Sequence, residues 1–198
     1  MKRPAATRVG LGDPLETARF ILRPLGYIEA FRLTASWRND PEVLIALFQS
    51  LKPRSLRKWM RSPLLPRPKV RFAYAIIDRE SGRSIGVHTV ALSGYRSAYF
   101  TVAVSDRDWW GKGAVLETRA TLINHFIRHA GTERFFGMVH GRNLSSIFNY
   151  QRLGFSHVGS WHRHKQDPVS GEIFDVVLFE LFREQWQAGP FAEAIDEP

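Results

Sequence analysis

The chain has 198 residues, 44% of them hydrophobic, which predicts one globular domain able to bury its own core. It contains no cysteine, which excludes disulfides, thiolate zinc sites and a cysteine nucleophile. The formal net charge of +9 favours an acidic partner such as nucleic acid, anionic lipid or a polyphosphate ligand.

The ends of the chain suggest no targeting segment. No apolar run is long enough to cross a membrane, and no apolar stretch follows the basic N-terminus, so we expect a cytoplasmic protein. Residues 1–14 and 189–198 have the composition of tails, and residues 15–188 are expected to form a single domain without internal repeats.

The first third of the chain combines one strand with short helices. A β-rich run predicts a strand at 20–25. Helical character follows at 27–38, 39–48 and 55–61, and the proline-rich segment 63–68 predicts a loop.

The middle of the chain is predicted to form a hairpin, a strand and the longest helix. The hairpin pairs 72–77 with 84–92 across a Ser-Gly turn, and a strand follows at 99–104. From Gly113 onward the apolar residues recur with helical period, and Gly131 suits the C-terminal end of that helix.

The last third predicts strands at 135–139, 155–161 and 173–181 and helices at 143–153 and 183–187. The whole order of elements predicts an α+β protein, in which a mixed sheet carries helices on its faces.

The turn Trp110–Ala114 is the first candidate for chemistry. Gly111 and Gly113 let the backbone bend tightly and leave its amides uncovered. The N-terminus of the following helix directs unpaired N–H groups and partial positive charge outward, which favours a phosphate, and Lys112 adds charge. The Walker and Rossmann patterns do not match, since Leu116 holds the position of the third Rossmann glycine, and a tight connection without ligand is the alternative.

The segment Asn143–Phe155 is the second candidate. Asn143, Ile147 and Tyr150 lie on one helical face. The segment resembles the Asn-x-x-Ser/Ala…Tyr-x-x-x-Gly-Phe motif of GNAT-type N-acetyltransferases, and Trp110–Gly113 resembles the acetyl-CoA pyrophosphate loop of that superfamily.

Two upstream segments extend the resemblance. Leu15–Leu25 and Trp37–Val43 resemble the branch that includes ribosomal-protein N-terminal acetyltransferases, and amino-sugar acetyltransferases are similar as well. The likeness runs from Leu15 to Trp186 with its pieces in the expected order.

The resemblance implies a GNAT-like fold, a central mixed and splayed sheet of six to seven strands flanked by helices, with acetyl-CoA as co-substrate. An amine would attack the thioester carbonyl directly, which agrees with the missing cysteine. The cofactor contacts that it implies are the strand backbone at Val102, Ala103 and Val104, the turn residues Trp110, Gly111, Lys112, Gly113 and Ala114, and Asn143 with Ser146.

Tyr150 occupies the position of the family's general acid. A phenol with a pKa of about 10 can protonate a departing thiolate whose parent thiol has a pKa near about 8.5. The alternative is a core tyrosine on an amphipathic helix. Asn143 has a similar alternative as a helix cap, and so does Ser146.

The general base is less defined. We select His88, because an imidazole with a pKa of about 6.5 suits proton acceptance, with His140 and Asp106 as further candidates and a structural role for His88 as the alternative. At pH 7 an α-amine with a pKa of about 8 is roughly one-tenth neutral, so it could react without a strong base.

Two further clusters, at 161–165 and at Trp109–Trp110, predict neither a metal site nor a nucleic-acid site. His162 and His164 alternate on a strand, but Arg163 and Lys165 disfavour a cation there, so no metal is expected. Trp109–Trp110 could stack on nucleic-acid bases, although we expect Trp110 to pack the start of the cofactor turn.

The turn departs from the family pattern at a few positions. Asp108 stands where the superfamily commonly has Gln or Arg. Val115 and Leu116 stand where the branch has small residues, and helical periodicity directs them toward the core rather than the cofactor.

The sequence therefore predicts an acetyl-CoA-dependent N-acetyltransferase acting on a primary amine, with a protein or peptide N-terminus favoured. The alternatives are a small-molecule or amino-sugar acetyltransferase and a catalytically inactive acetyl-CoA-binding or nucleic-acid-associated domain. We expect a monomer or homodimer, no membrane partner and no nucleic-acid partner. The loops 51–69 and 165–171 would set the acceptor.

Overall fold

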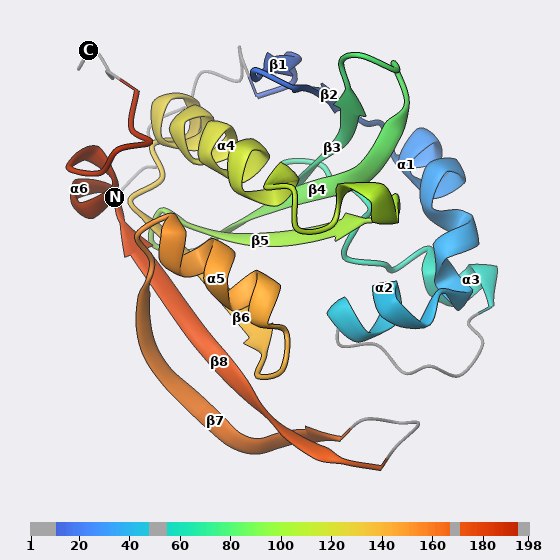
Figure 1. Ribbon diagram of the computed structural model, residues 1–198. Coiled ribbons are helices and arrows are strands. Elements are labelled where there is room, and N and C mark those ends of the chain that lie inside the picture. The colour runs from blue at the N-terminus through green and yellow to red at the C-terminus, as the bar shows by residue number, and fades with distance from the viewer. Residues whose placement is uncertain (1–10, 48–54, 167–170, 194–198) are drawn as a thin grey trace.

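The computed structural model describes residues 11–47, 55–166 and 171–193, and an eight-stranded sheet forms its centre (Figure 1). The strand order is β1-β2-β3-β4-β5-β6-β8-β7. The strands are β1 Leu15–Glu16, β2 Phe20–Pro24, β3 Arg71–Asp78, β4 Ser84–Ser93, β5 Ser97–Val104, β6 Arg134–His140, β7 Ser156–Gln166 and β8 Ile173–Phe182. The predicted α+β class with a mixed sheet is confirmed, and the strand count exceeds the expected six to seven because Leu15–Glu16 pairs with β2 as a strand of its own.

The described helices are α1 Tyr27–Thr34, α2 Pro41–Ala46, α3 Leu56–Trp59, α4 Ala114–Ala130, α5 Leu144–Arg152 and α6 Arg183–Gln187. The predicted helix 27–38 is divided, because α1 ends at Thr34 and a 3-10 turn, Ala35–Asn39, continues it. Pro41 begins α2, as suits a residue that lacks an N–H and has a preset φ.

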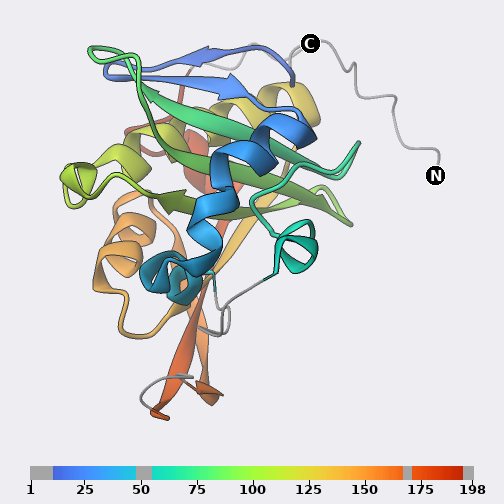
Figure 2. The ribbon, with the colours of Figure 1, turned by 90° about the vertical axis from the view of Figure 1, so that its right-hand side faces the viewer.

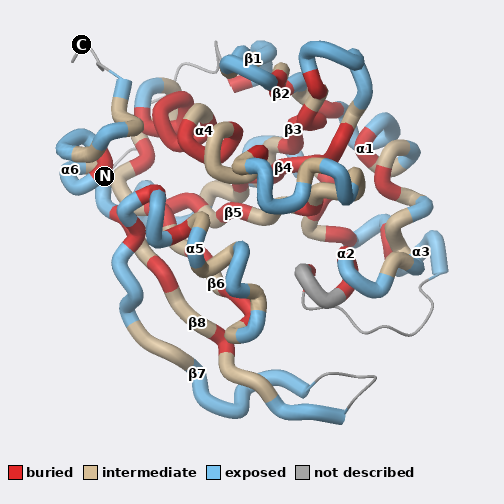
Figure 3. Tube along the Cα trace, in the orientation of Figure 1, coloured by how far each residue is buried: buried red, intermediate tan, exposed pale blue. Residues whose placement is uncertain are grey.

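Helices cover both faces of the sheet (Figures 1 and 2). On one face, α4 and α5 pack their apolar residues, among them Phe126 and Tyr150, against the strands. On the other face, α1 to α3 close a second cluster around Trp59 and Val43. Buried positions accordingly follow the central strands and the inner side of α4, whereas β7 is largely exposed (Figure 3).

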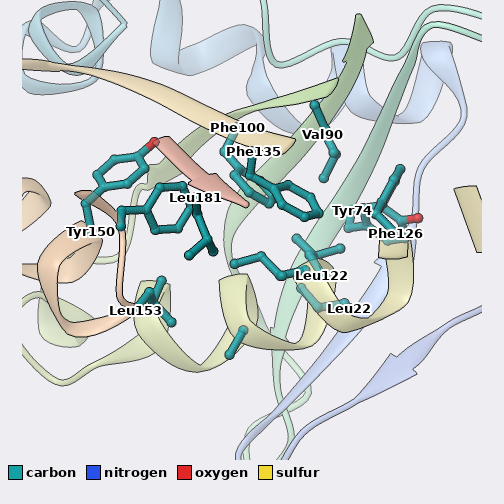
Figure 4. Packing of buried hydrophobic residues seen from close by; sticks show 14 of the residues in the cluster. Leu22, Tyr74, Val90, Phe100, Leu122, Phe126, Phe135, Tyr150, Leu153 and Leu181 are labelled. Atoms are coloured by element: carbon teal, nitrogen blue, oxygen red, sulfur yellow. The ribbon is translucent and has the colours of Figure 1, made fainter. Parts of the chain in front are cut away.

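The longest helix, α4, ends where its sequence predicts. Gly131 adopts a left-handed φ of 59°, and its N–H donates to the carbonyl of Phe126. The apolar stripe of the helix packs with Leu22, Tyr74 and Val90 from the sheet (Figure 4).

The sheet opens between β5 and β6. These strands pair in parallel only from Ser97 with Arg134 to Tyr99 with Phe136. Residues 100–104 of β5 continue without a β6 partner, while their other side stays paired with β4 as far as Val104. The expected splay is therefore present, and it leaves one backbone edge of β5 open within the described part of the chain.

The regions predicted as tails lie only partly within the described residues. Leu11 is buried, and its carbonyl accepts a hydrogen bond from the Tyr74 hydroxyl at 2.8 Å. Phe191 packs beside Trp186, and its carbonyl accepts from the Asn124 amide at 3.0 Å. The boundaries of the domain stay a prediction. None of the described helices is long and apolar enough to cross a membrane.

Candidate active site

A cavity of about 580 Å³ occupies the opening between β5, the start of α4 and α5, with α2 at its side. It brings together all but two of the residues predicted from the sequence. Those that line it are Val102, Ala103, Val104, Trp110, Gly111, Gly113, Ala114, Asn143, Ser146 and Tyr150. His88 and Lys112 do not line it.

The glycine turn at one end of the cavity needs its glycines. Gly111 and Gly113 have φ values of 73° and 78°, in the left-handed region that costs other residues about 1–2 kcal/mol. The indole N–H of Trp110 donates to the carbonyl of Val104 at 2.9 Å, which holds the start of the turn against β5 as predicted. The Lys112 side chain is exposed and outside the cavity lining, so its predicted direct contact lacks support from this geometry.

An ion pair between Arg19 and Glu117 holds the glycine turn in place. Arg19 donates through Nε to the carboxylate of Glu117 at 2.8 Å and through Nη1 to the carbonyl of Lys112 at 2.9 Å. Thr17 also donates to Glu117 at 2.6 Å. Burial raises the pKa of Glu117, but the hydrogen bonds from Thr17 and Arg19 outweigh it and leave the pKa below its ordinary value. The turn and the first turn of α4 are thus tied to the segment that leads into β2.

Asn143 caps α5 at the opposite wall. Its side-chain oxygen accepts a hydrogen bond from the N–H of Ser146 at 3.0 Å, so the predicted cap is confirmed. Both residues also line the cavity, so the cap and a cofactor contact are compatible.

Tyr150 is buried where α5 meets β6. Its ring stacks on Phe179 with centroids 5.0 Å apart and meets Phe155 edge-on at 4.8 Å. The guanidinium of Arg119 lies 4.3 Å from the ring centroid. Figure 4 shows the ring at one end of the apolar cluster that continues through Leu181, which explains its rigid placement, while the residue still lines the cavity.

The position of His88 disfavours its predicted role as the general base. The side chain has no exposed surface, and neither ring nitrogen has a hydrogen-bond partner among the described residues. Burial, and then the charge of Arg119, hold the pKa of His88 well below the ordinary value, so the ring stays neutral at pH 7. It packs edge-on against Phe100 at 5.5 Å, which is the structural alternative.

The two other base candidates differ in position. Asp106 does not line the cavity, and its carboxylate accepts from the N–H of Asp108 at 3.1 Å. His140 lines the cavity and stacks on Phe174 at 3.6 Å. Its Nδ1 lies 3.1 Å from the N–H of Arg142 and accepts that bond, so the neutral ring carries its proton on Nε2.

The histidines of β7 do not keep the alternation along the strand that the sequence predicts. His162 contacts Asp175 at 2.9 Å, while a register shift and the positive φ of Arg163 interrupt the alternation that would align it with His164.

Val115 and Leu116 were expected to face the core, yet both line the cavity. The cavity opens beside α4, so a side chain on its inner face can border the cavity and the core together.

Several residues that line the cavity were not predicted from the sequence, and Glu42 and Arg119 are two charged ones among them. Glu42, on α2, pairs with Arg107 at 2.9 Å. Arg119 lies on α4 three residues after Leu116 and three before Leu122, and this charge within the apolar stripe is the signal that marks it.

Comparisons with known proteins agree with this geometry. A family model described as an acetyltransferase (GNAT) domain matches residues 19–156, more than half of the chain. A spermidine N-acetyltransferase from Vibrio cholerae in complex with CoA and spermine shares the fold with a TM-score of 0.70 and 15% identity, over 85% of this chain and 98% of that chain. The ribosomal-protein-S5-alanine acetyltransferase from Vibrio fischeri has a TM-score of 0.66 and 15% identity, over 88% of this chain and 98% of that chain. RimJ from Mycobacterium smegmatis in complex with a CoA disulfide has a TM-score of 0.63 and 17% identity, over 89% of this chain and 90% of that chain.

Proposed function

Because the chain belongs to the GNAT family of acetyltransferases, we propose that it acetylates a primary amine, with a protein or peptide N-terminus as the favoured acceptor. Acetyl-CoA is the co-substrate of this family. The finer assignments, namely the acceptor, the acid and the binding residues, rest on the geometry of the cavity.

One observation carries the proposal: the cavity joins an open strand edge to a glycine turn at a helix N-terminus. The free edge of β5 at 102–104 suits the amide groups of a pantetheine arm, which pair as a further strand would. The left-handed glycines and the start of α4 suit a pyrophosphate.

Tyr150 is proposed as the general acid. Bound acetyl-CoA supplies an acetyl group activated as a thioester. The acceptor nitrogen attacks the carbonyl carbon, a C–N bond forms, the C–S bond breaks and the electron pair leaves with sulfur. Tyr150 donates its phenolic proton to that sulfur, the proton lost by the nitrogen passes to solvent, and the Tyr150 phenolate regains a proton from solvent.

His88 is fully buried and Asp106 does not line the cavity, and an amine that is partly neutral at pH 7 depends less on a base. An α-amine with a pKa of about 8 meets this condition far better than a lysine side chain with a pKa of about 10.4. Two proteins of similar fold are named as a ribosomal-protein-S5-alanine acetyltransferase and a spermidine N-acetyltransferase. Both names specify an amine acceptor, which supports the proposal of an amine here.

The test is mass spectrometry of acceptors incubated with acetyl-CoA, using peptides with free N-termini, amino sugars and polyamines. We expect a mass gain of one acetyl group on peptides. Tyr150→Phe should lower kcat by about 10²–10⁴-fold with cofactor affinity nearly unchanged. Tyr95→Phe is the matched control, because Tyr95 is fully exposed and outside the cavity.

The alternatives give distinct outcomes. Acetylation of amino sugars alone would favour the small-molecule reading. Binding of acetyl-CoA without turnover on any acceptor would favour an inactive sensor, and an unaltered kcat in Tyr150→Phe would remove Tyr150 from the mechanism. If calorimetry detects no binding of acetyl-CoA at micromolar concentration, the enzyme reading fails.

A further inference from the structure

Arg119 is a buried cation on the wall of the cavity. The residue is 1% exposed, and its Nε and Nη1 atoms have no hydrogen-bond partner among the described residues. It nevertheless lines the cavity between β5 and α5. Burying a guanidinium without hydrogen-bond partners costs desolvation free energy, and a ligand that accepts its hydrogen bonds would offset that cost.

Within the described part of the chain, the guanidinium of Arg119 contacts aromatic rings and no hydrogen-bond acceptor. The guanidinium carbon lies 4.3 Å from the ring centroid of Tyr150 and 5.5 Å from that of Phe100. These contacts offset part of the desolvation of the cation but provide no hydrogen-bond acceptor of the kind a guanidinium needs. His88, the nearby titratable ring, is neutral and leaves the charge uncompensated.

No carboxylate of the cavity is available to Arg119. Among the described residues that line the cavity, Glu42 alone is acidic, and it pairs with Arg107 at 2.9 Å. Arg142 and Arg152 add further positive charge to the lining, and Arg142 is paired with Glu172. The cavity is therefore cationic beyond the glycine turn that suits the phosphates.

The position of Arg119 relates this charge to the reacting group. Its guanidinium covers the ring of Tyr150, the proposed proton donor to sulfur, so it lies at the thioester end rather than the phosphate end. An acetyl group is uncharged and would leave the guanidinium unpaired. A carboxylate at the end of a short acyl chain would pair with it in a charge-assisted hydrogen bond.

We propose that the site accepts, besides acetyl-CoA, a CoA thioester of a dicarboxylic acid such as succinyl-CoA, with Arg119 binding the free carboxylate. This inference rests on the proposed function. The chemistry is unchanged: the amine nitrogen forms the C–N bond, the C–S bond breaks, sulfur takes the electron pair and then the proton of Tyr150. The distal carboxylate keeps its charge throughout and serves recognition alone.

Two stable thioethers test the recognition without an acceptor. S-(3-carboxypropyl)-CoA and S-butyl-CoA match in chain length and differ in a terminal carboxylate against a methyl group. Isothermal titration of the wild-type protein should show the carboxylate form binding about 10- to 100-fold more tightly. Equal or weaker binding of the carboxylate form would overturn the inference.

Substitutions then assign the preference to one residue. Arg119→Gln should remove the preference while S-butyl-CoA binds within about threefold of wild type, and Arg119→Lys should retain part of it. Arg152→Gln, another cavity-lining arginine, is the matched control and should leave the ratio of the two affinities unchanged. A preference that persists in folded Arg119→Gln, or disappears in Arg152→Gln, contradicts the assignment.

The outcome also separates this inference from the proposed function. If S-butyl-CoA binds and acetyl transfer proceeds while the carboxylate form has no advantage, only the second acyl donor is rejected. If neither thioether nor acetyl-CoA binds, the acetyltransferase proposal fails with it. Turnover with succinyl-CoA and an acceptor peptide, read as a mass gain of one succinyl group, completes the test.

Discussion

Gly137 and Tyr150 are in unusually close contact. A Cβ atom built on Gly137 would lie 2.1 Å from the phenolic oxygen of Tyr150 and 2.3 Å from the adjoining ring carbon. Gly137 is therefore required for close approach rather than for backbone conformation. The absent side chain on β6 leaves the space that the proposed acid occupies, and the ring of Phe179 stacks on Tyr150.

We expect Gly137→Ala to displace the phenol and lower kcat at least tenfold, with destabilisation of about 1–3 kcal/mol from overpacking. Cofactor affinity should change little, because the glycine turn is untouched. Steady-state kinetics and chemical denaturation give the two readouts. Gly94→Ala is the matched control, since nothing lies within 4 Å of its added Cβ. A full kcat in Gly137→Ala would contradict the role of a precisely seated Tyr150.

At the scale of elements, the start of α4 is held by the segment before β2 as well as by its own sequence. The left-handed Gly113 begins the helix without a side-chain cap. Arg19 and Thr17, from outside the helix, bind Glu117 in its first turn and the carbonyl of Lys112 in the turn before it. A carboxylate near a helix N-terminus is also favoured by the helix dipole.

The lowered pKa of Glu117 predicts a pH dependence of stability. Its pKa in the folded protein lies below the ordinary 4.5, so its contribution is present above pH 4.5 and is lost as pH falls through the lowered pKa. Glu117→Gln should therefore cost about 1 kcal/mol at pH 7 and flatten the stability profile below pH 4.5. Urea denaturation across this range measures it. Glu29→Gln, which removes an exposed pair with Arg23, is the control for the loss of a surface ion pair at pH 7. A steep profile in Glu117→Gln would refute the assignment.

At the scale of the molecule, the opening in the sheet divides the β5 wall from the α5 wall of the cavity. Only the short parallel contact of Ser97–Tyr99 with Arg134–Phe136 joins β5 to β6. A cofactor lying along β5 and under α5 would contact both walls and act as a cross-link in the folded state.

Cofactor binding should therefore stabilise the whole domain. At about 100 times its Kd, CoA should add about 2.7 kcal/mol, seen as a rise in Tm. Hydrogen exchange should slow at 100–104 of β5 and in α5 as well as at the glycine turn. ADP, which has the pyrophosphate but not the pantetheine arm, should protect the turn alone. Identical protection by CoA and ADP would show that the arm does not bridge the opening.

Local patterns by themselves predicted most elements and most of the residues that line the candidate cavity. The helical period predicted α4, the glycines at 111 and 113 predicted its tight entry, and Asn143 predicted a cap that is present. These features depend on neighbours within a turn of helix or a few residues of chain, so sequence carries them directly. The likeness to a known family then related the two segments to one cofactor.

Tertiary structure alone decided which of the candidate side chains line the cavity. Both faces of the sheet are covered by helices, so alternation along β4 could not tell whether His88 faces a core or a site, and packing buried it. The opening between β5 and β6 turned Val115, Leu116 and Arg119 toward a cavity instead of a closed core. Such outcomes depend on where distant strands stop pairing, a long-range property that no local pattern encodes.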